Sequence, residues 1–244
     1  MMNTVTDVWQ ALVPPDGDRH GPLTPFLLLL TVVTGLVDAF SYLVLGHVFV
    51  ANMTGNVVFL AFALVGAKGF SFDASLLALA AFVVGALITG RLIVHLGSRR
   101  GRLLAVTTTA EVALVAAALA LASSVSQPGA GTSRYVLIAL LGLATGLQNA
   151  SARKLAVPDL TTTVLTMTIT GIAFDSRLAG GTNSRIGRRG LSAVAMFAGA
   201  LVGAVTVLHV SKSLALAFAL VLLVPVALGA ALWSRSKPVW DEPT

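Results

Sequence analysis

Residues 34–56 read TGLVDAFSYLVLGHVFVANMTGN, a stretch that brings polar side chains into one of the most apolar regions of the chain. Those side chains are Asp38, Ser41, Tyr42, His47, Asn52, Thr54 and Asn56. An acid such as Asp38 costs roughly 2.5 to 3.5 kcal/mol at the centre of a membrane helix, so its presence there needs a reason. We interpret the stretch as part of a solute site in a membrane protein.

The composition places the chain in a membrane. Of its 244 residues, 56% are hydrophobic and 11% are charged, whereas roughly 25% of a soluble domain is charged. There is no cysteine, which excludes disulfide scaffolds, thiolate nucleophiles and thiolate metal sites. The net charge of +6 comes from Arg and Lys between apolar runs, where topology and lipid headgroups explain it. We therefore expect the lipid bilayer, and no nucleic acid, as a partner.

Eight apolar runs follow one another along the chain. They cover residues 26–45, 48–66, 75–96, 103–122, 135–152, 160–174, 191–209 and 214–233. A spanning helix needs about 20 residues. The second run is interrupted by Asn52, Gly55 and Asn56, and the sixth is short and rich in Thr. The sequence thus predicts an all-α membrane protein with six to eight transmembrane segments, of which the second and sixth helices are interrupted.

The two interrupted segments occupy matching places in a weak internal repeat. Thr34-Gly35-Leu36 matches Thr145-Gly146-Leu147, and Asp38 then falls on Asn149. Chance matching is the alternative, because Ala, Leu, Val and Gly dominate the composition. The repeat predicts a division into a polar N-terminal segment, a first membrane half, a linker, a second membrane half and a tail. These parts are residues 1–25, 26–122, 123–134, 135–233 and 234–244.

The basic loops bear on how the two halves are oriented. Eight crossings would make the halves parallel, yet they would place the basic loops at 99–102 and 177–189 on opposite sides. The positive-inside rule wants both loops in the cytoplasm. Six crossings satisfy the rule if one interrupted segment in each half enters the membrane without spanning it, and the halves are then inverted. The sequence leaves both arrangements open.

The expected solute site combines a polar helix face with the break that follows it. Asp38 and Tyr42 share one face of the first run, and Asn149 lies on a similar face of the fifth. In the break, Gly55 relaxes the backbone, and the half-helix that starts near Val57 offers unpaired N–H groups to an anion or to the negative end of a dipole. Simple helix packing is the alternative. The predicted solute-binding residues are Asp38, Tyr42, Asn52, Thr54, Gly55, Asn56, Asn149, Thr163 and Thr166.

Two acids are candidates for coupling transport to a proton or cation. Asp38 is the first, and Glu111 is the other acid well inside an apolar run. A neutral Glu111 that bonds a neighbouring helix is the alternative. The sequence contains no metal-ligand spacing and no serine-hydrolase, Walker or dinucleotide motif. We therefore expect no cofactor and no enzymatic activity.

The segments GLVDAFSYL and FVANMTGN, with the later GLQNA and a Thr-rich stretch, resemble the YoaK family, also called domain of unknown function 1275. The resemblance covers residues 24–233. It implies a multi-pass protein of the bacterial inner membrane and brings no known substrate. It marks Gly35, Asp38, Asn52, Thr54, Gly55, Asn56, Gly146, Asn149, Thr162, Thr163 and Thr166 as recurring positions. Where a second TGN triplet is expected the chain reads Thr166-Met167-Thr168, so we expect an asymmetric site centred on the first half.

A small-solute transporter or permease with a site between the halves is the function that we expect, and its solute is unknown. If Asp38 carries the coupling ion, Asp38→Asn should abolish coupled uptake without affecting folding. A passive channel or facilitator is one alternative. A membrane accessory or assembly protein without a solute path is another, and a homo-oligomer is also left open.

Overall fold

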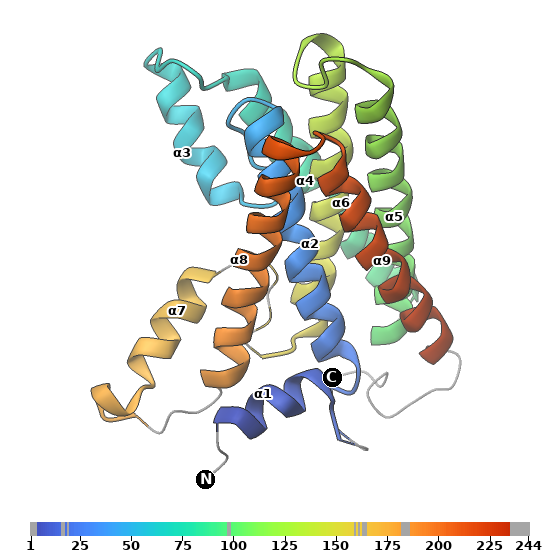
Figure 1. Cartoon of the computed structure of the whole chain (residues 1–244). Coiled ribbons are helices and arrows are strands. Elements are labelled where there is room, and N and C mark those ends of the chain that lie inside the picture. Colours follow the sequence, from blue (N-terminus) through green and yellow to red (C-terminus); the bar gives the residue numbers. More distant parts are fainter. Residues whose placement is uncertain are drawn as a thin grey trace.

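The computed structural model describes residues 4–15, 18, 20–96, 99–158, 160, 162, 165–181 and 186–234. Throughout these residues the regular structure is helical (Figure 1). The α-helices are α1 (Thr4–Leu12), α2 (Leu23–Val44), α3 (Met53–Leu64), α4 (Phe72–Leu96), α5 (Arg100–Ser124), α6 (Gly131–Leu155), α7 (Leu165–Phe174), α8 (Ile186–His209) and α9 (Leu214–Trp233). A short 3-10 helix, Arg177–Ala179, follows α7. The predicted all-α class is confirmed.

Six of the described helices are long and apolar enough to cross a membrane. They are α2, α4, α5, α6, α8 and α9, with 20 to 25 residues each. In contrast, α3 has 12 residues and α7 has 10, which is too short for a bilayer core about 30 Å thick. The second and sixth apolar runs, which the sequence predicts to be interrupted, therefore hold the two short helices.

The two short helices begin near mid-height and run outward in opposite directions. Figure 1 shows α3 rising from the middle of the molecule to its upper end, and α7 descending from the middle to the lower end. The long helices that precede them also run in opposite directions, since α2 starts at the lower end and α6 starts at the upper end (Figure 1). Both short helices therefore point their N-termini toward the centre of the molecule.

Hydrogen bonds at the helix ends fix this alternation. At the upper end, Nε of Arg134 at the start of α6 donates to the Leu45 carbonyl oxygen just after α2, at 2.6 Å. At the lower end, the Arg100 guanidinium at the start of α5 donates to the Leu155 carbonyl oxygen at the end of α6. Of the two orientations that the sequence leaves open, the structure has the one in which α2 and α6 run oppositely. The duplication itself stays a prediction.

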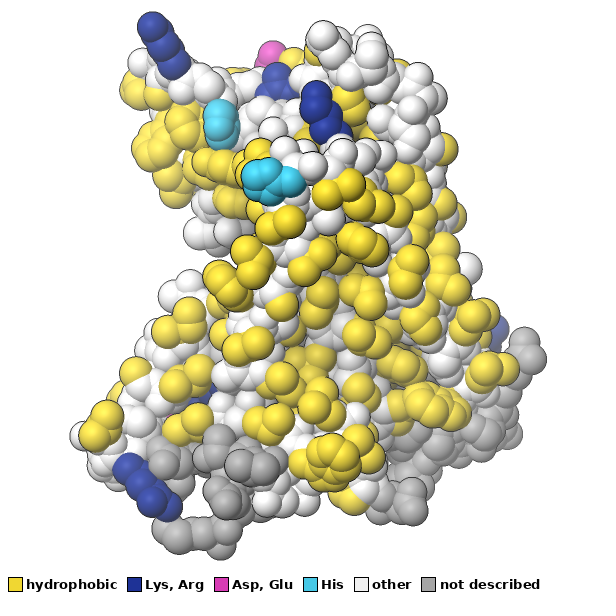
Figure 2. Space-filling model, viewed as in Figure 1, with side chains coloured by type: hydrophobic (Ala, Val, Ile, Leu, Met, Phe, Trp, Pro, Cys, Tyr) yellow, Lys and Arg dark blue, Asp and Glu magenta, His cyan; other side chains and the backbone are white. Residues whose placement is uncertain are grey.

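Lys and Arg side chains gather at the lower end. Figure 2 shows hydrophobic side chains over the middle of the molecule and cationic ones toward its ends. At or near the lower end lie Arg100, Arg102, Arg153, Lys154, Arg177, Arg188 and Arg189. At the upper end lie Lys68, Arg134 and Lys212. We call the lower end the basic end and the upper end the opposite end.

Close helix pairs build the bundle. Helix α2 packs against α8 and α9, α4 packs against α6, and α5 packs against α6 and α9. Helix α2 is buried over most of its length, with Leu27, Val33 and Phe40 in the core. The short helices are peripheral, since α3 packs on α4 and α7 packs on α8. The long helices therefore form the packed centre of the molecule, and the half-helices lie at its side.

Helix α1 lies within the segment that the sequence marks only as polar. It contacts α8 and α2, and it lies across the basic end in Figure 1. Trp9 is 64% exposed on it. Nine residues with an exposed aromatic ring at the end of a bundle are typical of a helix that lies in the membrane interface.

Candidate functional site

Asp38 hydrogen-bonds the backbone of the break, the non-helical segment between α2 and α3. This residue lies on α2 and is 4% exposed. Its Oδ1 accepts hydrogen bonds from the backbone N–H groups of Val50, at 3.1 Å, and Ala51, at 2.9 Å. Two backbone donors that no helix satisfies thus have a carboxyl acceptor from a neighbouring helix. The Asp38 side chain anchors the break.

Two more side chains complete the support. Asn56 on α3 is fully buried; its Oδ1 accepts from the Phe49 N–H at 3.0 Å, and its Nδ2 donates to the Phe49 carbonyl oxygen at 2.6 Å. From α6, the Thr145 hydroxyl donates to the Val50 carbonyl oxygen. Side chains from α2, α3 and α6 therefore satisfy backbone N–H and carbonyl groups of the break that water would otherwise hydrogen-bond.

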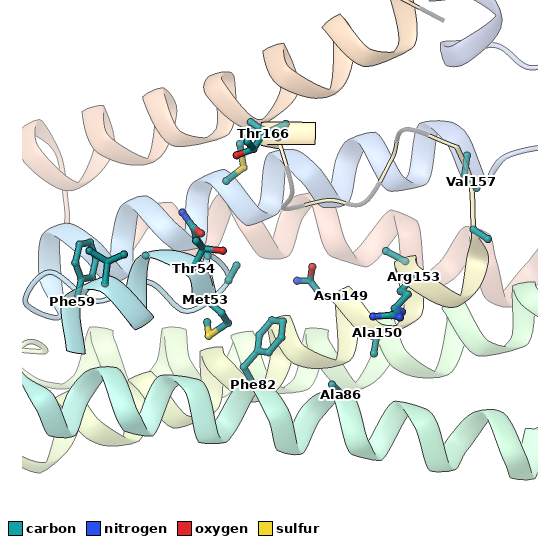
Figure 3. Close-up of a pocket in the computed structure, with 18 residues that line it drawn as sticks. Met53, Thr54, Phe59, Phe82, Ala86, Asn149, Ala150, Arg153, Val157 and Thr166 are labelled. Carbon is teal, nitrogen blue, oxygen red and sulfur yellow. The ribbon is translucent and has the colours of Figure 1, made fainter. Parts of the chain in front are cut away.

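A cavity of about 970 Å³ lies beside the break, between the starts of α3 and α7. Figure 3 shows Thr54, Phe82 and Asn149 around this space, with Arg153 farther along α6 toward Val157. The outline of the molecule is hollowed between the α3 and α7 lobes in Figure 2. Its polar lining residues are Asn52, Thr54, Asn149, Arg153 and Thr166. Its larger apolar lining residues are Met53, Val58, Phe59, Phe82, Val157, Leu165 and Met196.

The N-termini of both half-helices form part of this wall. Met53 and Thr54 are the first residues of α3, and Leu165 and Thr166 are the first of α7. The first N–H groups of a helix have no partner within the helix and carry a partial positive charge. Asn52, the N-cap of α3, makes no side-chain capping hydrogen bond. The cavity is therefore electropositive on the side of its half-helices.

Arg153 supplies a full positive charge to the same cavity. It lies in the last turn of α6, one turn beyond Asn149. No hydrogen bond or ion pair joins it to any residue that the structure describes. Among the described lining residues there is no acid to neutralise it. The guanidinium is therefore available to a ligand.

An aromatic cluster closes the cavity toward the opposite end. We use this name for Tyr42, His47, Phe49, Phe59, Phe62 and Phe70. The rings of Tyr42 and Phe49 stack with their centroids 4.9 Å apart, and those of Phe49 and Phe59 are 5.6 Å apart. Phe59 also lines the cavity, which extends the other way to Ala156 and Val157 near the basic end. The cavity therefore extends toward the basic end and is bounded by packed rings toward the opposite end.

The structure divides the residues predicted from the sequence into two groups. Asn52, Thr54, Gly55, Asn149 and Thr166 line the cavity. Outside its lining lie Asp38 and Asn56, which bond the break, and Tyr42, which belongs to the aromatic cluster. Thr163 lies outside the described residues. Glu111 is 1% exposed on α5, its Oε2 has no hydrogen-bond partner among the described residues, and it does not line the cavity.

Arg153 and Phe82 line the cavity although the sequence does not predict them as site residues. The expected fifth run ends at Ala152, whereas α6 continues to Leu155 and carries Arg153 into the cavity wall. A signal was present, because Arg153 follows Tyr42 by the same 111 positions that separate Asp38 from Asn149. Phe82 lies in a run of ordinary apolar residues, and nothing in the sequence sets it apart.

Together these features define a multi-pass α-helical membrane protein with two half-helices whose N-termini meet at a cavity near mid-height. The family model described as "Protein of unknown function (DUF1275)" matches residues 26–229, and the chain belongs to this family. It is also 35% identical over 149 residues to the UPF0700 transmembrane protein YoaK of Bacillus subtilis (strain 168). That match covers 61% of this chain and 65% of the relative's length. No solved structure matches the chain.

Proposed function

We propose that the chain is a small-solute transporter or permease and that the cavity between α3 and α7 is its substrate site. The observation that carries the proposal is the convergence of two half-helix N-termini on a cavity near mid-height of the bundle. Broken helices are tolerated at membrane depth where they are buried in protein or line a cavity. Substrate sites of many transporters are built from such helices. The volume of about 970 Å³ suits an organic solute.

Alternating access is the mechanism that this geometry favours. The positive-inside rule assigns the basic end to the cytoplasm, in a cell membrane that we take to be the bacterial inner membrane. The cavity reaches Ala156 and Val157 at that end, while the stack of Tyr42, Phe49 and Phe59 separates it from the opposite end. In the proposal this is the inward-open form. Transport then requires the aromatic cluster to part while the basic end closes.

Asp38 acts in this proposal as a positioning residue. Its Oδ1 holds Val50 and Ala51, and so sets where α3 begins and where its N–H groups point. A coupling role for Asp38 is the second candidate, because its Oδ2 is buried and has no hydrogen-bond partner among the described residues. Glu111, which does not line the cavity, is the other coupling candidate.

The packed aromatic cluster favours a transporter over a permanently open channel. A passive facilitator remains the alternative within solute transport, and saturable uptake separates the two. An accessory protein without a solute path would need no cavity. The proposal includes no enzymatic step and no second copy of the chain.

A stabilisation screen with a matched pair of variants tests the proposal. A solute that binds the folded protein raises its unfolding temperature. Purified protein is screened against a panel of neutral, anionic and cationic metabolites, and the hits are assayed for uptake into proteoliposomes. Ala86→Trp fills the cavity from α4 and should abolish both signals. Ala80→Trp, on an exposed part of α4 outside the cavity lining, should preserve them. Equal binding and uptake by the two variants would overturn the proposal.

A further inference from the structure

We infer that the cavity binds a small organic anion, a carboxylate with an apolar body. The inference rests on the proposed function only in taking this cavity as the solute site. It names the chemical class of the solute from three properties of the wall, which are its charge, its hydrogen-bond donors and its apolar surface.

The charge of the wall is positive. Arg153 is the one ionisable side chain among the described lining residues, and it has no partner among the residues that the structure describes. A guanidinium offers a planar fork of donors that matches the two oxygens of a carboxylate. A cationic solute would meet this charge with no acid to offset it. A neutral solute would leave the guanidinium unused.

Donors near Arg153 extend the same preference. The cavity contains the starts of α3 and α7, and Asn149, whose Nδ2 donates to the Thr145 carbonyl oxygen at 3.0 Å, lines it one turn from Arg153 on α6. The α3 start has no side-chain cap, so its first N–H groups are free of that competitor. A negative group placed among them would interact favourably with two positive helix ends as well as with Arg153.

The rest of the wall is apolar and selects the body of the solute. Phe82 from α4, Met53 and Phe59 from α3, and Met196 from α8 line it. The volume of about 970 Å³ is far larger than chloride or formate needs. A small inorganic anion would leave these side chains without contact. An aromatic or alicyclic carboxylate would bury its ring against Phe82 and its charge at Arg153.

Benzoate, benzamide and benzylamine make a matched set of probes, since they share a ring and differ in charge. Binding to purified full-length protein in detergent is measured by calorimetry and by the shift in unfolding temperature. We expect benzoate to bind and the other two to bind at least about tenfold more weakly, because neither of them can accept the charged hydrogen bonds of Arg153 with a carboxylate. Chloride should bind more weakly than benzoate as well.

Variants at Arg153 locate the contact. Arg153→Gln should weaken benzoate binding at least about tenfold, and Arg153→Lys should restore part of it, because the charge returns without the planar fork. Lys154→Gln is the control, since Lys154 is the next residue on α6 but does not line the cavity. It should bind benzoate as the parent does. Equal benzoate binding by Arg153→Gln and Lys154→Gln would overturn the inference.

A lipid headgroup is the other source of an anion near the end of α6. Benzoate binding is therefore measured with and without phosphatidylglycerol, at constant ionic strength. Stabilisation by the lipid but not by benzoate would overturn the inference that the solute is a carboxylate. Binding or uptake of benzamide or benzylamine that Ala86→Trp abolishes would overturn the anion inference and leave the proposed transporter intact. The proposed function itself would be overturned if Ala86→Trp changed neither the binding of any probe nor any uptake.

Discussion

Gly35 of α2 and Gly199 of α8 lie directly against each other at a helix crossing. A Cβ added to Gly35 would come within 3.0 Å of the Gly199 carbonyl carbon and within 2.5 Å of the Met196 carbonyl oxygen. Gly85 of α4 has the same relation to Gly146 of α6, because its Cβ would come within 3.1 Å of the Gly146 carbonyl carbon. In the predicted repeat, Gly35 corresponds to Gly146 and Gly85 to Gly199. If the halves are duplicated, the two crossings are the same contact with the halves exchanged.

Gly35→Ala and Gly85→Ala should each destabilise the folded protein by about 1 to 3 kcal/mol, because the added methyl group meets backbone atoms that cannot rotate away. Unfolding of the purified protein by heat or by denaturing detergent measures the effect. Gly90→Ala, on α4 with no atom within 4 Å of its added Cβ, is the control. It should be about 0.5 to 1 kcal/mol more stable than the parent, since alanine is the better helix former. Equal stability of Gly90→Ala and Gly35→Ala would contradict close packing at the crossing.

Asp38→Ala should destabilise the protein by about 1 to 3 kcal/mol for each backbone N–H that loses its acceptor, at Val50 and at Ala51. Asp38→Asn should be milder, because its amide oxygen still accepts both bonds. If Asp38 positions α3, Asp38→Asn keeps uptake of the solute found by screening, and Asp38→Ala loses it. A stable Asp38→Asn protein without uptake would instead assign the coupling role to this acid.

Thr145→Val should destabilise the protein by about 1 to 3 kcal/mol and weaken solute binding, because the Val50 carbonyl oxygen loses the hydroxyl that reaches it from α6. Thr107→Val on α5 is the matched control. Its hydroxyl bonds only carbonyl oxygens of its own helix, at Leu103 and Leu104. Its substitution should leave binding unchanged. Parallel losses in both variants would show that hydroxyl removal acts on helix stability alone.

The absence of cysteine makes the chain suited to single-cysteine labelling. Ala150→Cys in the cavity should react with a membrane-impermeant thiol reagent added on the side that also labels Arg102→Cys at the basic end. It should be protected from the side that labels Lys68→Cys, because the aromatic cluster intervenes. The Ala150→Cys, Phe59→Ala double variant should react from both sides. Reaction of Ala150→Cys only from the Lys68 side would reverse the proposed direction of the opening.

Much of the fold is local information. The eight apolar runs, the two interrupted ones among them and a break between the first two helices follow from residue type and spacing, because the bilayer sets the length of a spanning helix. The break lies earlier than expected, since α3 begins at Met53 and not near Val57. The family is also visible in local motifs. The ends of the helices are harder to predict, since a helix extends beyond its apolar residues. That error hid Arg153, which lies just past the expected end of the fifth run at Ala152 but still within α6.

By itself the sequence determined that the chain is a membrane protein, that its second and sixth helices are broken, and that polar residues concentrate at the first break. The tertiary structure decided what each polar residue does. Asp38, Asn56 and Thr145 turn to the backbone of the break, while Asn52, Thr54 and Asn149 turn to the cavity. The cost of a polar group in a membrane is a property of the residue, and so it can be read along the chain. Its partner comes from another helix, such as α6 for Val50, and only the packing of the bundle brings the two together.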